Sequence, residues 1–290
     1  MVILVTGSTG FVGSYIVKYL EKKYVLRQLV RRKTAKGKGQ VVEGNLADEK
    51  SIDKAVKGCD IIIHAAAILD AEDPNIFKVN VRATRRLVEA AKRYKVKQFI
   101  FISTENVVHN CPDAYSQSKK IAEEEVRKFK NHTILREPIV YGPGDKRYLG
   151  KIIKSVKHLP VIPLPAGGKF TLQPVYVEDI GRYIEQAIKL KICGTHLITG
   201  GESITYRELV RKIMKLMKKR KLLIPVPLTP IKIVAATLEL VGIKPPLTTV
   251  QLNNMVLNRK YDVQEQIRIF KIKPTPLEEG LRKTIGTKSL

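Results

Sequence analysis

The stretch that decides the fold is residues 2–13, VILVTGSTGFVG. It begins with the short apolar run Val2–Val5, which is typical of a buried strand, and it leads into an amphipathic segment with helical periodicity. Between strand and helix lie Gly7, Gly10 and Gly13, at the spacing Gly-x-x-Gly-x-x-Gly. The stretch therefore predicts a strand, a glycine turn and a helix in immediate succession.

Each glycine has a separate purpose in such a turn. Gly7 permits the sharp change of direction, Gly10 lets the backbone approach a pyrophosphate, and Gly13 lets the helix pack closely on the sheet. The helix N-terminus then presents free N–H groups and the positive end of its dipole to the phosphates. The turn thus predicts a dinucleotide-binding site, formed by Gly7, Thr9, Gly10, Phe11, Val12 and Gly13.

Strand and helix patterns alternate beyond the turn. Apolar runs predict strands at Val25–Val30, Val41–Val42, Asp60–His64, Lys97–Ser103, His132–Leu135 and Thr195–Ile198. Helical periodicity predicts helices at Glu49–Val56, Asn75–Tyr94, Ala114–Phe129, Glu178–Leu190 and Tyr206–Lys219. This alternation predicts an α/β fold, a Rossmann-type doubly wound parallel sheet covered by helices on both faces.

The pattern loosens after residue 142, where prolines and glycines become frequent. We expect residues 1–142 to form the dinucleotide-binding Rossmann domain, to which a later segment of about residues 171–200 returns. Residues 143–290 are expected to form a smaller, mostly helical C-terminal lobe that binds the substrate.

The residues after the second predicted strand bear on the choice of cofactor. An NAD-specific site places an acidic residue there to bind the ribose 2′-hydroxyl, whereas this chain has Arg31 and Arg32. Two guanidinium groups attract a 2′-phosphate and can bind it bidentately. We therefore predict NADP(H) in preference to NAD(H). The alternative is a basic surface loop in a chain that is basic throughout.

Several segments together resemble an extended short-chain dehydrogenase/reductase. They are the glycine turn, His64–Ala67, Asn80 in Val-Asn-Val, Ser103–Thr104, Tyr115-Ser-Gln-Ser-Lys119, residues 135–143 (LREPIVYGP) and residues 175–180 (VYVEDI). Residues 173–179 and the ending at residues 273–279 (KPTPLEE) also resemble an atypical branch of that family. That branch includes the NADPH-binding accessory subunit of respiratory complex I.

The pair Tyr115 and Lys119 carries the expected chemistry. Residues four apart share one face of a helix. A nearby ammonium favours the phenolate and lowers a phenol pKa that is ordinarily near 10. Tyr115 can then take or give an alcohol proton while hydride moves to or from a nicotinamide. The resemblance further implies that Thr104, with Ser103 beside it, orients the substrate oxygen.

The resemblance also implies cofactor contacts outside the glycine turn. The expected residues are Asn45, Leu46, Ala65, Ala66, Ala67, Asn80, Ser103, Tyr115, Lys119 and Pro138. Asn45 stands where the family usually has an Asp that contacts the adenine amine, and its amide oxygen can accept the same bond. No metal site is expected, because His and Cys residues lack ligand spacing.

Two positions depart from the nucleotide-sugar epimerases of the family. Those enzymes use an Asn and an Arg where this chain has Ile139 and Leu172. A nucleotide-sugar diphosphate would lose two contacts, which weakens an epimerase assignment. One hypothesis is therefore an NAD(P)-dependent oxidoreductase or epimerase with Tyr115 as acid/base. The other is a cofactor-binding protein whose nucleotide is structural or regulatory, docked on a membrane or respiratory complex.

Composition limits the partners and the compartment. The chain carries 53 Lys and Arg against 27 Asp and Glu, a net charge of +26. The basic residues are scattered, as on the solvated surface of a lysine-rich thermophile protein, so we expect no nucleic-acid partner. A small-molecule substrate is expected, and the apolar, proline-rich stretch Leu222–Leu247 favours an apolar one or a partner surface. A homodimer and peripheral membrane association are compatible with the sequence. The three cysteines lie far apart and fit a reducing cytoplasm.

Overall fold

A computed structural model describes residues 1–32, 39–243, 245 and 248–286, and it divides the chain into two compact units. The first unit comprises Met1–Pro138, Val177–Ile198 and Gln264–Lys273. The second comprises Ile139–Tyr176, Thr199–Val263 and Pro274–Leu290. All of the catalytic and cofactor-binding residues expected from the sequence belong to the first unit.

The first unit is built on a seven-stranded parallel sheet of order β11-β6-β5-β4-β1-β2-β3. Its strands are β1 (Val2–Thr6), β2 (Val25–Val30), β3 (Gln40–Glu43), β4 (Ile61–His64), β5 (Gln98–Thr104), β6 (His132–Glu137) and β11 (Gly194–Leu197). The chain proceeds from β1 to β3 in one direction and from β4 to β11 in the other. This reversal beside β1 is the position at which open α/β sheets bind nucleotides.

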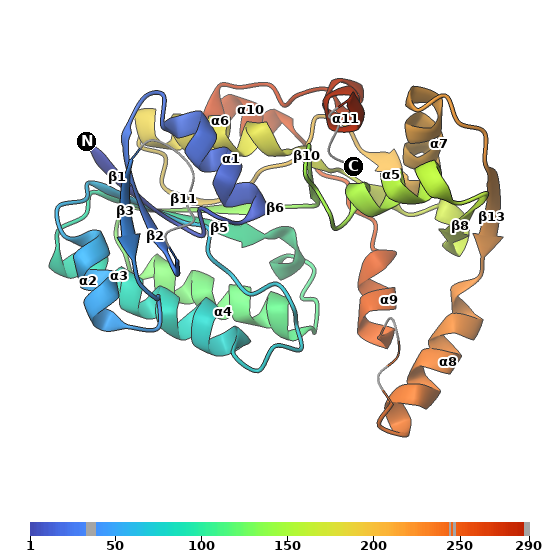
Figure 1. Cartoon of the computed structure of the whole chain (residues 1–290), viewed down its shortest axis with the longest axis horizontal. Coiled ribbons are helices and arrows are strands. Elements are labelled where there is room, and N and C mark those ends of the chain that lie inside the picture. Colours follow the sequence, from blue (N-terminus) through green and yellow to red (C-terminus); the bar gives the residue numbers. More distant parts are fainter. Residues whose placement is uncertain (33–38, 244, 246–247, 287–290) are drawn as a thin grey trace. The chain divides into compact units, whose positions relative to one another are not determined.

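Helices cover both faces of this sheet (Figure 1). On one face lie α2 (Glu49–Val56), α3 (Ala83–Arg93) and α4 (Ala114–Arg127), and on the other lie α1 (Phe11–Leu20) and α6 (Val177–Lys189). Helix α10 (Gln264–Phe270) packs against α6. Since both faces are covered, the strands are apolar throughout, as Ile61–Ile63 illustrates with every side chain buried. The predicted Rossmann-type fold is therefore confirmed.

One predicted helix differs in its first turns. Helical periodicity indicated a single helix over Asn75–Tyr94, but Lys78–Arg82 is π-helical and α3 begins at Ala83. Asn80 lies inside this turn, and its side chain bonds to the backbone of Ile68. Single π-helical turns are wider than α-helical ones and recur at functional sites. The periodicity of the sequence does not distinguish them from an ordinary helix.

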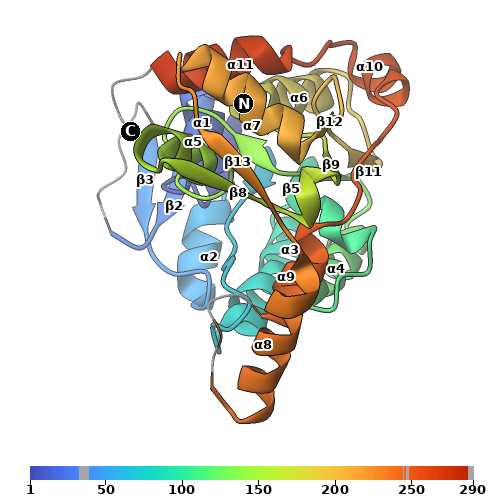
Figure 2. The same cartoon turned by 90° about the vertical axis from the view of Figure 1, so that its right-hand side faces the viewer.

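The second unit is a smaller mixed structure, with its core between α5, α7 and α11 (Figure 2). Its helices are α5 (Leu149–His158), α7 (Tyr206–Leu216), α8 (Leu228–Leu240), α9 (Thr249–Met255) and α11 (Leu277–Gly286). Its strands form three short pairs, β7 (Val140–Tyr141) with β10 (Val175–Tyr176), β9 (Thr171–Leu172) with β12 (Ile204–Thr205), and β8 (Val161–Pro165) with β13 (Leu222–Val226). Among the described residues, no helix is long and apolar enough to cross a membrane.

The pair β8 and β13 was not predicted from the sequence, because prolines interrupt both stretches. In the structure the two strands run parallel, with Pro163 opposite Ile224 and Pro225 opposite Leu164. A proline cannot donate to a ladder, but a strand with only one neighbour has an outer edge that needs no donor. Buried Ile162 and Leu164 then join the core of the second unit.

Candidate functional site

The glycine turn between β1 and α1 is shaped for close contact with a ligand. Gly7 has φ +74°, and a Cβ atom there would lie 2.5 Å from the nitrogen of Ala66. A Cβ at Gly13 would lie 2.0 Å from the carbonyl oxygen of Gly7. Gly10 donates to that same carbonyl at 3.0 Å and precedes α1 as its cap. The turn therefore excludes side chains at Gly7 and Gly13.

The N-terminus of α1 has the properties expected of a phosphate-binding site. Its cap residue Gly10 has no side chain that could occupy the terminal N–H groups, and the first turn holds no acidic residue. Phe11 and Val12 in that turn are half-buried, and Thr9 just before it is exposed. Backbone N–H groups at such a terminus favour an anion.

Ser8 is a candidate that the sequence analysis missed. Its side chain is buried, and its Oγ atom has no hydrogen-bond partner among the described residues. A buried hydroxyl without a partner costs free energy, and a ligand phosphate could supply the missing bond. Its place inside the glycine turn is the sequence feature that could have identified it.

The two arginines lie beside the glycine turn. Thr9, Val30, Arg31 and Arg32 line a cleft of about 360 Å³. Both arginine side chains are exposed, and they directly follow β2. Lys33, next in the basic run, lies outside the described residues. A positively charged cleft at the end of β2 suits a phosphate on the adenosine ribose.

The remaining expected cofactor residues fall into two groups. Ala65, Ala66 and Ala67 are half-buried and follow β4, where the backbone of Ala65 and Ala66 lies next to Gly7. Asn45 is exposed, and its Oδ1 atom accepts from the nitrogen of Ala47 at 3.0 Å. Their contacts with a cofactor stay predictions.

Three other expected cofactor residues have contacts or a defined place within the first unit. They are Asn80, Leu46 and Pro138. The amide nitrogen of Asn80 donates to the oxygen of Ile68 at 2.9 Å and to Ser118 Oγ at 3.0 Å. Asn80 therefore ties the segment after β4 to α4. Leu46 packs on the core beneath the sheet, and Pro138 is the buried residue that follows β6.

Helix α4 carries Tyr115 in its first turn and brings Lys119 to the carboxyl end of β5. Asp113 caps the helix by accepting from the nitrogen of Ser116 at 2.9 Å, which places Tyr115 in the first turn. Lys119 is buried, its Nζ atom donates to the carbonyl of Ile102 at 2.6 Å, and it lies 3.8 Å from the centre of the Phe101 ring. Burial lowers the pKa of Lys119 to about 7.

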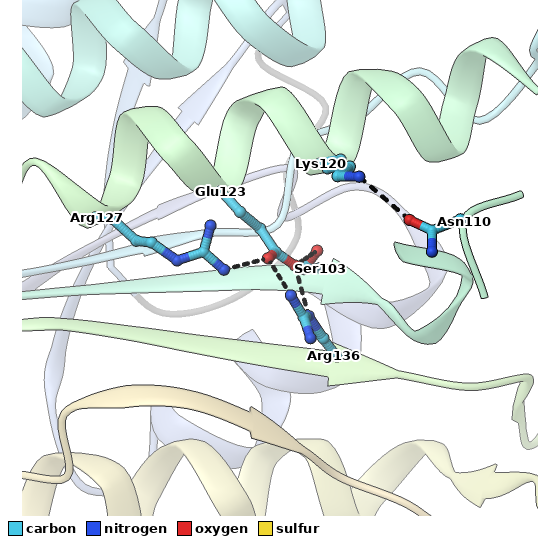
Figure 3. A network of polar contacts seen from close by, with 6 residues as sticks. All are labelled: Ser103, Asn110, Lys120, Glu123, Arg127 and Arg136. Carbon is cyan, nitrogen blue, oxygen red and sulfur yellow. Dashed lines mark hydrogen bonds and ion pairs between the residues drawn. The ribbon is translucent and has the colours of Figure 1, made fainter. Parts of the chain in front are cut away.

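A buried ion pair fixes α4 on the sheet (Figure 3). Glu123 accepts from Ser103 Oγ at 2.7 Å, from Arg136 at 2.9 and 2.6 Å, and from Arg127 at 2.8 Å. Burial alone would raise the pKa of Glu123, but the hydrogen bonds from Arg136 and Ser103 outweigh it and lower that pKa. Since Glu123 lies one helical turn beyond Lys119, this contact fixes the position of the helix that carries Lys119.

The two hydroxyl residues expected at the end of β5, Ser103 and Thr104, have different hydrogen-bond partners. The Ser103 hydroxyl donates to Glu123, so Ser103 helps to anchor α4 on the sheet. Thr104 ends the strand, and its Oγ1 atom accepts from the nitrogen of Asn106 at 3.3 Å. Because successive side chains of a strand point to opposite faces, only one of them can face a substrate. Thr104 is the stronger candidate, and its role stays a prediction.

Glu137 is a second candidate that the sequence analysis missed. It ends β6 at the position paired with Thr104 of β5, so both side chains lie on one face at the carboxyl edge of the sheet. Its Oε2 atom is buried and has no hydrogen-bond partner among the described residues. Burial raises the pKa of Glu137 to about 8, although Lys119 opposes the shift. The sequence feature that could have identified Glu137 is its position as a charged residue at the end of a buried strand.

The site thus combines the glycine turn after the first strand with a tyrosine and a lysine on the helix after the fifth strand. The fold and these residues define a Rossmann-type protein of the extended short-chain dehydrogenase/reductase type. The model of the NAD dependent epimerase/dehydratase family matches residues 3–196, and the chain belongs to that family. The resemblance stated from the sequence is confirmed.

Named relatives include enzymes and a respiratory subunit. A UDP-glucose 4-epimerase of Vibrio cholerae is 29% identical, with 78% of this chain and 79% of the relative covered. A ceramide reductase of Caulobacter vibrioides is 28% identical, over 78% of this chain and 74% of the relative. A NADH dehydrogenase 1 alpha subcomplex subunit 9 of Dictyostelium discoideum is 29% identical, over 62% of this chain and 53% of the relative. The chain is therefore an oxidoreductase or epimerase of this family.

Solved structures agree on the fold. The UDP-glucose 4-epimerase of Thermus thermophilus in complex with NAD has a TM-score of 0.74 at 22% identity, and the match covers 99% of this chain and 98% of the epimerase. A likeness at this identity confirms the architecture of the chain, and that neighbour carries NAD.

Proposed function

We propose that the protein is an NADP(H)-dependent oxidoreductase that interconverts an alcohol and a carbonyl compound. The observation that carries the proposal is the placement of Lys119. Its amino group is buried at the end of β5, one helical turn from Tyr115. Burying an amino group is costly, and a purely structural nucleotide would not require it there.

Three side chains perform the proposed chemistry. In the reduction, Tyr115 donates its phenolic proton to the substrate oxygen as that oxygen gains negative charge. Lys119 stabilises the phenolate that results, because an adjacent ammonium lowers the pKa of a phenol. The Thr104 hydroxyl donates a hydrogen bond that holds the oxygen in place. In the oxidation, the proton returns to Tyr115.

The chain's own residues fit a dinucleotide. The turn leaves no space for a Cβ at Gly7 or Gly13, and the buried Ser8 hydroxyl has a bond to offer a phosphate. Arg31 and Arg32 beside this turn would hold a 2′-phosphate, which is our reason for proposing NADP(H) over NAD(H). When bound, the nicotinamide supplies or accepts the hydride.

The substrate is proposed to lack a nucleotide diphosphate. Leu172, which stands where the epimerases use an arginine, is buried in the core of the second unit, and Ile139 packs against the same core. Neither position offers a charge or a hydrogen bond to a diphosphate. The similarity to a ceramide reductase supports an apolar carbonyl compound.

A second candidate function is a structural or regulatory nucleotide in a partner of a respiratory or membrane complex. The similarity to the Dictyostelium discoideum subunit favours it. Under this second function the protein binds NADPH tightly but shows no turnover that depends on Tyr115. The first function requires such turnover.

The decisive experiment is Tyr115→Phe, assayed by NADPH oxidation with long-chain aldehydes, aromatic ketones and menadione, and by epimerisation of UDP-glucose. We expect kcat with a carbonyl substrate to fall by about 10²- to 10⁴-fold, because the acid is removed. The Kd for NADPH should change little. Tyr94→Phe is the matched control, since Tyr94 follows α3 and precedes β5, at the opposite edge of the sheet.

Undiminished carbonyl reduction by the Tyr115→Phe variant would disprove its acid/base role. Epimerisation of UDP-glucose by the wild type would overturn the substrate proposal. NADPH binding by a wild type that turns over none of the four probes would favour the structural nucleotide.

A further inference from the structure

The second unit exposes an unusual number of large apolar side chains in one segment. Within residues 231–243 they are Ile231, Ile233, Val234, Leu240, Val241 and Ile243, with exposed fractions from 37% to 87%. In α8 only Ala235 is buried. Exposed apolar residues scattered singly are normal, but a contiguous group marks an interaction surface.

The outer face of α8 is apolar where a surface helix is ordinarily polar. Ile233, Thr237 and Leu240 follow one another at helical spacing, and Val234 and Val241 lie alongside them at i and i+7. Each of these five residues is exposed. Figure 1 shows α8 extending away from α5 and α7 of its own unit, with α9 beside it. Nothing in the described part of the second unit covers this face.

The unit that carries this face is basic, because its three segments contain 21 Lys and Arg against 7 Asp and Glu. Lys218, Lys219 and Arg220 are exposed and precede β13, which leads directly into α8. Residues 228–243 themselves contain one base, Lys232, and one acid, Glu239, whose carboxylate accepts from Thr249 at 2.8 and 2.9 Å. The chain as a whole has a net charge of +26. An occupant of this surface should therefore be apolar where it meets α8 and negatively charged where it meets the rest of this basic unit.

We propose that the second unit docks on an anionic lipid surface, with the outer face of α8 inserted among the upper acyl chains. A bilayer with anionic headgroups offers both an apolar interior and negative charge, which a second copy of this basic chain does not. The helix has 13 residues, and at about 1.5 Å per residue it is too short to span a hydrocarbon core of about 30 Å. It therefore lies in the interface. This docking does not depend on the proposed catalysis.

The absence of tryptophan from the chain allows a direct test. Leu240→Trp places one indole on the outer face of α8, and Val25→Trp places one on β2 in the first unit, where Val25 is also exposed. Each variant is titrated with vesicles of phosphatidylcholine mixed with phosphatidylglycerol, and with phosphatidylcholine alone. We expect a blue shift and quenching by brominated acyl chains for the α8 indole with the mixed vesicles, and neither for the β2 indole.

Co-sedimentation with the same vesicles tests the two contributions separately. Ile233→Ser with Val234→Ser should lower the partition coefficient by about tenfold or more, because apolar area leaves the interface. Lys218→Gln with Lys219→Gln should weaken binding to the anionic vesicles alone. Val25→Ser with Leu190→Ser, also exposed apolar positions, should bind as the wild type does. Melting curves of all variants establish that they are folded.

Three outcomes would overturn the proposal. The first is failure of the folded wild type to bind anionic vesicles. The second is vesicle binding that the α8 serine substitutions leave unchanged, since charge alone would then explain it. The third is a blue shift of the α8 indole that follows protein concentration without lipid, which would assign this face to a second copy of the chain.

Discussion

At the scale of single residues, Arg31 and Arg32 offer the sharpest test of cofactor choice. Their side chains line the cleft beside the glycine turn. We predict that Arg31→Ala with Arg32→Ala weakens NADPH binding by about 10- to 100-fold, since charge-assisted hydrogen bonds contribute about 1.5–3 kcal/mol. NADH binding should change little, because NADH has no 2′-phosphate. Fluorescence titration with both cofactors measures the ratio.

Lys218→Ala with Lys219→Ala is the control for this change. It also removes two positive charges, at exposed positions that precede β13 and lie far from the glycine turn in the sequence. An unaltered NADPH/NADH preference in the arginine variant would show that the 2′-phosphate assignment is wrong. An equal loss in both variants would indicate only a general electrostatic attraction.

Glu137 gives a prediction about pH. Its folded-state pKa of about 8 lies above the ordinary 4.5, so the folded protein binds this proton more tightly than the unfolded chain does. The resulting stability is present below pH 4.5 and is lost as the pH rises to about 8. Glu137→Gln removes the carboxyl group whose ionisation causes this loss of stability. We predict that the variant gains about 1–3 kcal/mol over the wild type between about pH 5 and pH 8.

Urea unfolding at several pH values measures this difference. Glu279→Gln provides the matched control, because Glu279 is half-exposed in α11 and pairs with Lys283 on the surface. A difference between Glu137→Gln and wild type that stays constant across that pH range would contradict the raised pKa. A difference of opposite sign would mean that Glu137 is ionised and stabilised by Lys119.

At the scale of elements, the position of α4 depends on Glu123. Its carboxylate joins α4 to Ser103 of β5 and Arg136 of β6. Removing one partner of a buried ion pair leaves the other charge uncompensated. We predict that Glu123→Gln lowers the free energy of unfolding by about 3 kcal/mol, whereas a surface pair such as that of Glu279 contributes under about 1 kcal/mol. Urea denaturation of both variants makes the comparison.

Acid should reduce the stability of the wild type through the same group. The pKa of Glu123 is lowered in the folded state, so its stabilisation is present above the ordinary pKa of 4.5 and is lost as the pH falls below it. The Glu123→Gln variant should lack this part of the acid sensitivity. If the two proteins lose stability in parallel as the pH falls through this range, Glu123 is not the anchor of α4.

The sequence was most informative where pattern and local geometry coincide. Helix α2 was predicted at its observed bounds, Glu49–Val56, from its helical periodicity, and in the structure Asp48 caps it. The strands of the parallel sheet were predicted because burial on both faces makes them continuous apolar runs. Strands β8 and β13 were missed, since their prolines are tolerated because each strand has an outer edge that needs no donor, and the sequence alone does not show which strands lie at an edge.

The candidate site shows the same limit. The glycine turn and the Tyr115–Lys119 pair depend on spacing within one segment, so the sequence displays them. The pairing of β6 with β5 places the carboxylate of Glu137 beside Thr104, and the bond from Ser103 to Glu123 joins residues twenty apart, so neither contact follows from spacing within one segment. Local sequence patterns do not indicate contacts between residues that are distant along the chain.

At the scale of the whole molecule, the charge has consequences beyond any single site. With 53 basic and 27 acidic residues, nearly half of the basic side chains have no acid to pair with one to one. A net charge this far from zero destabilises the compact state through self-repulsion, and salt screens it over a Debye length of about 10 Å at roughly 0.1 M. Buried pairs such as Glu123 with Arg136 are screened much less.

We therefore predict that the melting temperature at neutral pH rises with sodium chloride between about 0.01 M and 0.15 M. If screening contributes about 1–2 kcal/mol, the increase should be roughly 2–8 °C, since about 1 kcal/mol shifts the melting temperature of a chain of this order by about 2–4 °C. Sucrose at matched osmolarity controls for exclusion effects that do not involve charge. A melting temperature that stays level or falls with salt would mean that surface ion pairs outweigh the repulsion, because salt weakens those pairs as well.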